Sequence, residues 1–164
     1  MTEPPPVSSA LTELNVEHRV FRHPGPVRSL EQAARERGQE PGQVVRSLLF
    51  RISAGRFIMV LIAGAQQVDW RALRSHLDES RLTTASREEV LRITGYELGA
   101  VAPFGLSRAV PVLVDASVLI PEELSIGSGV RGVTIILKRD DLLRALQALG
   151  DAPIVRIGQE TLAK

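Results

Sequence analysis

The stretch Val44–Ile52, VVRSLLFRI, places a charged side chain among apolar ones. Side chains on a strand alternate between its two faces. One face therefore carries Val44, Arg46, Leu48, Phe50 and Ile52. Four of these five are large and apolar, which predicts that this face is buried. A buried guanidinium without a partner is costly, so Arg46 needs either a ligand or a polar partner inside the fold.

Two glycine-rich segments are the other places where the chain could do chemistry. They are YELGAVAPFGLS, residues 96–107, and IGSGVRG, residues 126–132. Glycine in such loops can serve ordinary turn geometry. It can also let successive backbone N–H groups approach a ligand and form an anion-binding concavity or an oxyanion hole. Two such loops, together with a charged residue on a buried strand face, favour a site over simple turns.

Other motif classes find little support. The chain has no cysteine, which excludes disulfides, thiolate metal sites and cysteine nucleophiles. The three histidines, His18, His23 and His76, are far apart and do not predict a zinc site. The letters GSGVRG match a dinucleotide fingerprint but lead into the β-rich run VTIILK rather than a helix. There is no G-K-[ST] and no serine in G-x-S-x-G, while a Ser-His-Asp triad, which is recognised by geometry, stays open.

Net charge and apolar runs bear on where the chain is located and on what it can bind. The formal net charge is +1, so a bound polyanion needs a local basic patch. The start, MTEPPPVSS, does not predict a secretory signal. The longest apolar run, FIMVLIAGA, is too short to span a bilayer. We expect a cytoplasmic protein without a membrane partner and with one domain over residues 1–164, of which 1–6 are disordered.

Capping residues and apolar periodicity predict the elements that must position these residues. We expect helices at 8–15, 29–38, 69–77, 86–95 and 139–150, and strands at 17–23, 44–52, 57–64, 109–115 and 133–138. The expected N-caps are Ser8 or Ser9, Ser29, Asp69, Ser86, and Asp140 or Asp141. The turn SAGR joins two strands into a hairpin. Strands that pair through hairpins and strands separated by helices indicate a mixed sheet covered by helices.

Five segments, in order from about Val16 to Leu149, resemble the YbaK and ProX-like, prolyl-tRNA-synthetase-associated editing domains. FRHP resembles their early strand and turn, and VVRSLLF the strand that normally carries lysine in a K-[ST]-L pattern. TGYELGAVAPFGL, residues 94–106, is the most specific piece and closely matches the family's T-G-Y-x-x-G-x-x-x-P-F-G loop. VLVDASVL resembles the strand ending in Asp, and IGSGVRGVTIILKRDDLLRAL the glycine loop, strand and final helix.

This resemblance implies a fold and an activity. The expected fold is α+β, with a mixed curved β-sheet flanked by helices. The implied activity is hydrolysis of a mischarged aminoacyl-tRNA, typically prolyl tRNA carrying alanine or cysteine. The chain has no synthetase domains, so we expect it to act in trans. The implied partners are the acceptor end of the aminoacyl-tRNA and a prolyl-tRNA synthetase, and no metal or organic cofactor is expected.

The resemblance also implies site residues. An aminoacyl ester is already activated, so the site must hold its carbonyl, orient a water and stabilise the oxyanion. The catalytic candidates are Arg46 and the backbone N–H groups of Gly127, Ser128 and Gly129. The substrate-binding candidates are Phe21, His23, Gly95, Gly99, Pro103, Phe104, Gly105, Asp115 and Arg131.

Arg46 stands where the family pattern has lysine, which leaves alternatives open. Lysine can lose a proton when buried, whereas arginine is a wide, permanently charged fork that cannot act as a base. Arg46 can orient the substrate of a deacylase. It can also anchor a phosphate or carboxylate in a catalytically silent module that binds an aminoacyl-tRNA, a nucleotide or a synthetase. In a third interpretation Arg46 is structural, with its head reaching an edge or a buried carboxylate.

Overall fold

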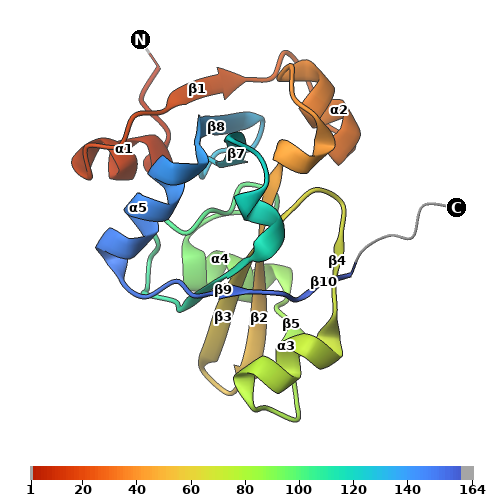
Figure 1. Cartoon of the computed structure of the whole chain (residues 1–164). Coiled ribbons are helices and arrows are strands. Elements are labelled where there is room, and N and C mark those ends of the chain that lie inside the picture. The colour runs from red at the N-terminus through yellow and green to blue at the C-terminus, as the bar shows by residue number, and fades with distance from the viewer. Residues whose placement is uncertain (1, 160–164) are drawn as a thin grey trace, which may run out of the picture.

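A long antiparallel hairpin, β2 (Val45–Ser53) and β3 (Arg56–Ala63), runs through the molecule (Figure 1). Its register pairs Arg46 with Ile62 and Ser47 with Leu61. Gly55 has a positive φ of 73° in the connecting turn, which glycine adopts without strain. This confirms the hairpin predicted from SAGR. The structure, a computed structural model, describes residues 2–159, so Met1 and residues 160–164 of the expected domain lie outside it.

The strands form three sheets. The largest has the order β5 (Thr83–Thr84), β2, β3, β6 (Val112–Asp115) and β9 (Ile154–Val155), and its β3–β6 and β6–β9 pairs are parallel. The second is antiparallel and contains β1 (Arg19–Arg22), β8 (Val133–Lys138) and β7 (Glu123–Gly127). The third pairs β4 (Gln67–Val68) with β10 (Gly158–Gln159). A parallel bridge between Val44 and Ser125 links the first two sheets, and the mixed α+β architecture is as predicted.

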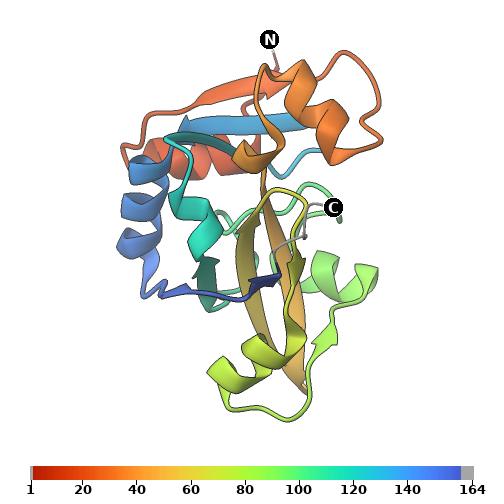
Figure 2. The same cartoon turned by 45° about the vertical axis from the view of Figure 1, so that its right-hand side comes forward.

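Within residues 2–159, five α-helices and two 3-10 turns surround these sheets. They are α1 (Pro6–Glu13), α2 (Leu30–Glu36), α3 (Trp70–Leu77), α4 (Arg87–Thr94), α5 (Arg139–Leu149), η1 (Pro41–Gln43) and η2 (Ala116–Leu119). In Figures 1 and 2, β1, β8 and α2 lie at one end of the molecule, and the hairpin tip with α3 lies at the other. Among the helices that the structure describes, none combines the length and apolar character needed to cross a bilayer.

Three of the five predicted helix starts are confirmed. Ser29, Asp69 and Ser86 each accept a hydrogen bond from a backbone N–H in the first turn, and Ser86 forms a capping box with Glu89.

The other two predicted starts are wrong. Helix α5 is preceded by Lys138 at its N-cap position without a side-chain cap, because Asp140 and Asp141 instead pair with Arg139 and Arg144. Helix α1 begins at Pro6, after a buried Pro5, so residues 5 and 6 are ordered although the sequence predicted disorder over 1–6. Proline suits the first helical turn, because its missing N–H would be unpaired there.

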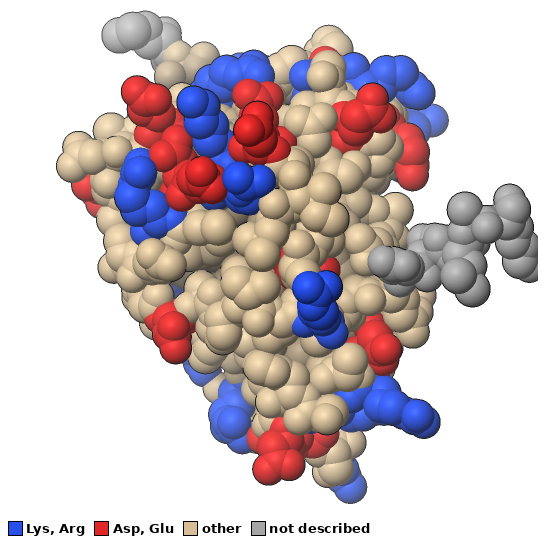
Figure 3. Space-filling view, viewed as in Figure 1, with Lys and Arg blue, Asp and Glu red and all other residues tan. Residues whose placement is uncertain are grey.

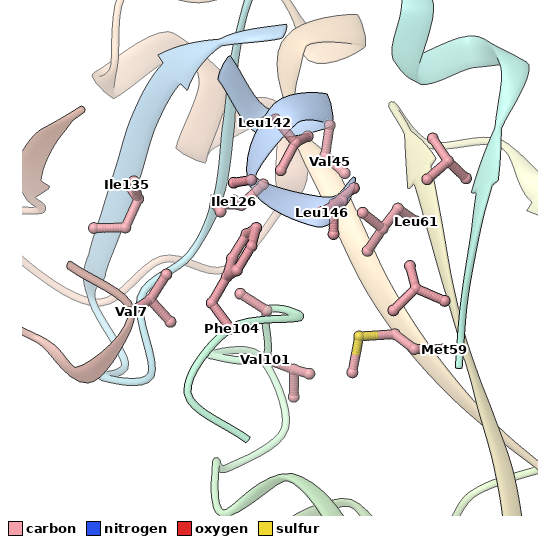
Figure 4. Close-up of a cluster of buried hydrophobic side chains, with 14 of the residues drawn as sticks. Val7, Val45, Met59, Leu61, Val101, Phe104, Ile126, Ile135, Leu142 and Leu146 are labelled. Carbon is pink, nitrogen blue, oxygen red and sulfur yellow. The ribbon is translucent and has the colours of Figure 1, made fainter. Parts of the chain in front are cut away.

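The hairpin is covered on both faces. Val45 and Leu49 of β2 join the main core with Met59 and Leu61 of β3, where Phe104 and the α5 leucines meet them (Figure 4). Phe50 lies on the opposite face, in a second cluster with buried residues of β3, β6 and α3. The prediction of one buried face was therefore incomplete, because helices and loops pack against both sides.

Candidate functional site

A cleft of about 700 Å³ opens between the segment that ends β1 and enters α2, the start of β2, and the end of β7. Four arginines line it, namely Arg28, Arg37, Arg46 and Arg131, and its lining residues include no carboxylate. The face drawn in Figure 3 shows the more usual arrangement, with acidic and basic side chains interspersed. A chain with a net charge of only +1 thus concentrates cations in one hollow, which favours an anionic ligand there.

Arg46 is engaged by the backbone of the loop that follows β3. Its Nε donates to the Gly64 carbonyl at 2.9 Å, and its Nη2 donates to the Gln66 carbonyl. Burial lowers the pKa of Arg46, yet within residues 2–159 no carboxylate pairs with it. The polar partners that Arg46 was predicted to need inside the fold are therefore two backbone carbonyls.

Arg37 is the second half-buried arginine of the cleft. Its Nε donates to His23 Nε2 at 3.1 Å, and its Nη1 donates to Ser125 Oγ at 2.8 Å. His23 Nδ1 in turn lies 2.7 Å from a carboxylate oxygen of Glu36. Burial lowers the pKa of Arg37 to about 10, against the opposing charge of Glu36, so the guanidinium stays protonated at neutral pH.

Gln32 extends this network into the loop that precedes α2. Its Nε2 donates to Glu36 Oε2 at 2.8 Å and to the Pro26 carbonyl at 3.1 Å, and its Oε1 accepts from the Arg28 N–H at 2.9 Å. The hydrogen bond from Gln32, followed by that from His23, lowers the pKa of Glu36. One chain of hydrogen bonds therefore fixes the loop that carries Arg28, the end of α2 and the His23 ring.

Sequence reasoning missed Arg37 and Ser125. Arg37 lies in the run ARERG at a helix end, where a charge is ordinarily solvated, and Ser125 lies in a strand, β7, that was not predicted. The two residues are 88 positions apart, so only the tertiary fold reveals their contact. The predicted candidates His23, Gly99, Gly127 and Arg131 do line the cleft.

The glycine loop after β7 serves mainly as structure. Gly127 packs so closely on the backbone of Ala100 and Val101 that a Cβ there would lie 2.8 Å from the Ala100 carbonyl oxygen. The Gly129 N–H donates to the Ala100 carbonyl at 2.8 Å, so it is not free for an oxyanion, and the prediction of that role is wrong. Ser128 is fully buried, its Oγ donates to the Val130 and Val133 carbonyls, and neither Ser128 nor Gly129 lines the cleft.

The loop over residues 94–106 is likewise mostly scaffold. Phe104 is fully buried in the main core, and Pro103 is buried beside it. The Tyr96 hydroxyl donates to the carbonyls of Phe104 and Gly105 at 2.7 and 2.9 Å. Gly95 ends α4 with a φ of 84°. None of Gly95, Pro103, Phe104 and Gly105 lines the cleft, so substrate contact at these positions stays a prediction.

Two further candidates also support the fold rather than line the cleft. The Phe21 ring packs edge-on against His23, with 5.0 Å between the ring centroids. Asp115 is buried and accepts hydrogen bonds from the N–H groups of Ser117, Ile157 and Gly158. Burial alone would raise the pKa of Asp115, but these hydrogen bonds outweigh it and hold that pKa below its ordinary value.

A second, smaller cleft of about 250 Å³ adjoins the first. The two share Arg46, Ser47, Leu48, Leu98 and Val101 as lining residues. The Ser47 hydroxyl is buried and, within residues 2–159, has no hydrogen-bond partner. Over the same residues no group of three or more metal-binding side chains converges. The junction of the clefts therefore offers a polar atom whose hydrogen-bonding capacity is unused.

Comparisons with known proteins bear on this site. A family model described as an aminoacyl-tRNA editing domain matches residues 24–145. The multifunctional Ser/Thr-tRNA deacylase ProXp-y of Escherichia coli K12 is 28% identical over 141 residues, which cover 84% of each chain. A proline–tRNA ligase of Kosmotoga olearia is 38% identical over 92 residues, 56% of this chain but only 16% of the ligase.

The fold comparison agrees. The crystal structure of a candidate trans-editing enzyme for prolyl tRNA synthetase superposes with a TM-score of 0.84 at 26% identity, over 94% of this chain and 96% of that one. The resemblance inferred from the five sequence segments is thereby confirmed.

Proposed function

The chain belongs to the aminoacyl-tRNA editing domain family, and from this premise we propose that it hydrolyses the ester of a mischarged aminoacyl-tRNA in trans. The observation that carries the proposal is the cleft with four arginines and no carboxylate, which suits the phosphates of an RNA 3′ end. The even coverage with the deacylase ProXp-y supports an independent enzyme. As substrate we propose prolyl tRNA carrying a small amino acid such as alanine or cysteine, met in the cytoplasm and delivered with a prolyl-tRNA synthetase as partner.

In the proposed reaction water adds to the ester carbonyl carbon and the bond from that carbon to the ribose oxygen breaks. The products are the free amino acid and the terminal hydroxyl of the tRNA. The protein has to hold the ester, position the water and stabilise the charge on the carbonyl oxygen. We assign the ester to the junction of the two clefts, where the unused Ser47 hydroxyl can donate to the carbonyl oxygen or hold the water.

A catalytically silent binding module is the second candidate, and two observations favour it. The Arg46 fork donates to the Gly64 and Gln66 carbonyls, and the Gly129 N–H donates to the Ala100 carbonyl. Two of the four groups that were expected to take part in catalysis are thus engaged within the fold. Such a module would keep the basic cleft for binding and would turn over no ester.

Single-turnover hydrolysis separates the two functions. The substrates are Ala-tRNA and Cys-tRNA for proline, with Ser-tRNA and Thr-tRNA as alternatives, and the variants are Ser47→Ala, Arg46→Lys and Arg46→Met. We expect the wild type to hydrolyse at least one of these esters and Ser47→Ala to slow that step on the order of a hundredfold, as for loss of one transition-state hydrogen bond. Ser53→Ala, at an exposed serine of the same strand, is the matched control and should be unchanged.

Each outcome bears on one assignment. A wild type that binds these tRNAs but hydrolyses none at high enzyme concentration would favour the silent module. Full activity in Ser47→Ala would remove the serine from the mechanism while leaving the function. If Arg46→Met is folded and active, the fork is structural, as its carbonyl partners indicate.

A further inference from the structure

Arg37 differs from the other hydrogen-bonded arginines in what it contacts. Arg19, Arg51, Arg56, Arg139 and Arg144 each pair directly with a carboxylate. Arg46 and Arg108 donate to backbone carbonyls. Arg37 donates instead to an imidazole and a hydroxyl, and both of these side chains are almost completely buried. Within residues 2–159 it has no direct carboxylate partner, so its charge is held in place without being paired.

The hydrogen bonds also assign the protons of His23. Because the Arg37 Nε donates to it, His23 Nε2 must be an unprotonated acceptor. The ring proton then lies on Nδ1, which donates to Glu36 at 2.7 Å. The imidazole is therefore neutral, and it separates the carboxylate of Glu36 from the guanidinium. Glu36 orients Arg37 through the ring but leaves its charge available to a ligand.

The position of Arg37 indicates the chemistry of the ligand that it would bind. It lines the large cleft with Arg28 and Arg131, and no carboxylate lines that cleft. Arg46 lies in the same cleft, but its Nε and Nη2 already donate to backbone carbonyls. A half-buried, oriented guanidinium favours a phosphate oxygen, since charge-assisted hydrogen bonds are strongest where water is partly excluded.

We propose that Arg37, oriented by His23 and Ser125, is the phosphate anchor of the cleft and binds a phosphodiester of the RNA 3′ end. This inference rests on the proposed function for the identity of the ligand. His23 and Ser125 are positioning residues, because they act through Arg37. Arg28 and Arg131, which are exposed at the cleft, add attraction at longer range.

Equilibrium binding tests the anchor without any turnover. The probe is an RNA hairpin that ends in single-stranded CCA, titrated by fluorescence anisotropy at several salt concentrations. Arg37→Met should weaken binding by about ten- to a hundredfold, as for loss of one charged hydrogen-bonding group. It should also reduce the slope of log K against log salt by about 0.7 to 1, the share of one phosphate contact. Arg37→Lys should restore the slope but only part of the affinity, because an ammonium lacks the fork.

The matched control is Arg35→Met, in the last turn of α2 and two residues before Arg37. Arg35 is exposed and does not line the cleft, so the same change of charge should leave affinity and slope close to wild type. Thermal unfolding of every variant separates loss of fold from loss of binding. If Arg37→Met does not fold, Arg37→Lys and Ser125→Ala carry the test, since both keep most of the local volume. AMP and inorganic phosphate, used as competitors, tell a general phosphate site from one that needs the RNA chain.

The outcomes separate the anchor from the enzyme. If folded Arg37→Met binds the hairpin like wild type with the same salt slope, the anchor is wrong, even if the protein is a deacylase. If binding depends on Arg37 but no aminoacyl-tRNA is hydrolysed, the anchor stands and the proposed hydrolysis fails. If the wild type binds neither the hairpin nor AMP, both are overturned.

Discussion

The cleft has two walls that are built in different ways. The α2 wall, residues 23–37, is held by hydrogen bonds between side chains, from Gln32 through Glu36 and His23 to Arg37. The loop wall, residues 94–106 with Gly127–Gly129, is held by backbone contacts and close glycine packing. The loop wall carries the most recognisable sequence motif, yet most of its residues support the fold. The α2 wall has an unremarkable sequence, yet it lines the cleft with polar side chains, whereas the loop wall lines it with none.

The largest effect should follow a methyl group added to the loop wall. Gly127→Ala places its Cβ against the Val101 carbonyl and 2.8 Å from the Ala100 carbonyl oxygen, and a backbone carbonyl cannot rotate away like a flexible side chain. We expect a loss of about 2 to 4 kcal/mol in the free energy of unfolding, at the upper range for overpacking. Urea denaturation followed by circular dichroism measures it.

The α2 wall offers the matched glycine. Gly25 lines the same cleft, has no positive φ, and a Cβ there would meet nothing within 4 Å. Gly25→Ala should therefore be neutral or slightly stabilising, by up to about 1 kcal/mol, because it restricts the unfolded chain. If Gly25→Ala and Gly127→Ala lowered the free energy of unfolding equally, the contrast between the walls would be contradicted.

Asp115 also supports the fold rather than the cleft, and its contribution to the free energy of unfolding depends on pH. Its depressed pKa means that the ionised carboxylate stabilises the fold. That stability is present above the unfolded pKa of about 4 and is lost as pH falls through the lower folded pKa. Asp115→Asn should cost about 1.5 to 3 kcal/mol at pH 7. The hydrogen bond from the Ser117 N–H is lost, and those from the Ile157 and Gly158 N–H groups no longer have a charged acceptor.

Unfolding free energies measured from pH 7 to pH 3 test this. The difference between wild type and Asp115→Asn should shrink as pH drops below about 4. A difference that stays constant over this range would mean that the charge of Asp115 does not stabilise the fold. Ser117→Ala is a control for Asp115→Asn, because it keeps the backbone N–H that donates to Asp115.

The sequence predicted the features that depend on residues close together in the chain. Ser29, Asp69 and Ser86 cap their helices because the partner N–H lies three residues away in each case. Distant partners override local preference elsewhere. Ser8, a predicted cap, is buried and its hydroxyl contacts His18 instead. The two-residue strands β9 and β10 gave no periodic signal, and Asp115 binds the N–H groups of Ile157 and Gly158 from 42 and 43 positions away.

The same distinction applies to the site. Arg46 was singled out because a charge breaks the alternation of a strand, and it does line both clefts, although its fork serves carbonyls 18 and 20 positions along the chain. Arg37 breaks no pattern, since a charged residue at a helix end is ordinary. Its role depends on Ser125 and His23, which reach it from β7 and from the end of β1.

Two fully buried serines give the closest comparison, because Ser125 holds Arg37 of the α2 wall and Ser128 belongs to the loop wall. Ser125 Oγ accepts from Arg37, whereas Ser128 Oγ donates to the carbonyls of Val130 and Val133. Ser128→Ala removes the donor to the Val133 carbonyl and the acceptor of the Val130 N–H, while the Val130 carbonyl keeps the Val133 N–H as a donor. It should therefore cost about 1 kcal/mol of stability and leave RNA affinity unchanged. Ser125→Ala should do the reverse, because the half-buried Arg37 can turn to water.

We expect Ser125→Ala to weaken binding of the CCA hairpin by about three- to tenfold, because Arg37 keeps its charge but loses one of its two positioning hydrogen bonds, with stability changed by less than about 0.5 kcal/mol. The salt slope should stay at the wild-type value, since the charge of Arg37 remains. In steady-state hydrolysis the loss should fall on KM rather than on kcat, because Ser125 positions a binding group and does not touch the ester. If Ser128→Ala lowers RNA affinity as much as Ser125→Ala does, the loop wall contacts the ligand after all, and the division between the two walls does not hold.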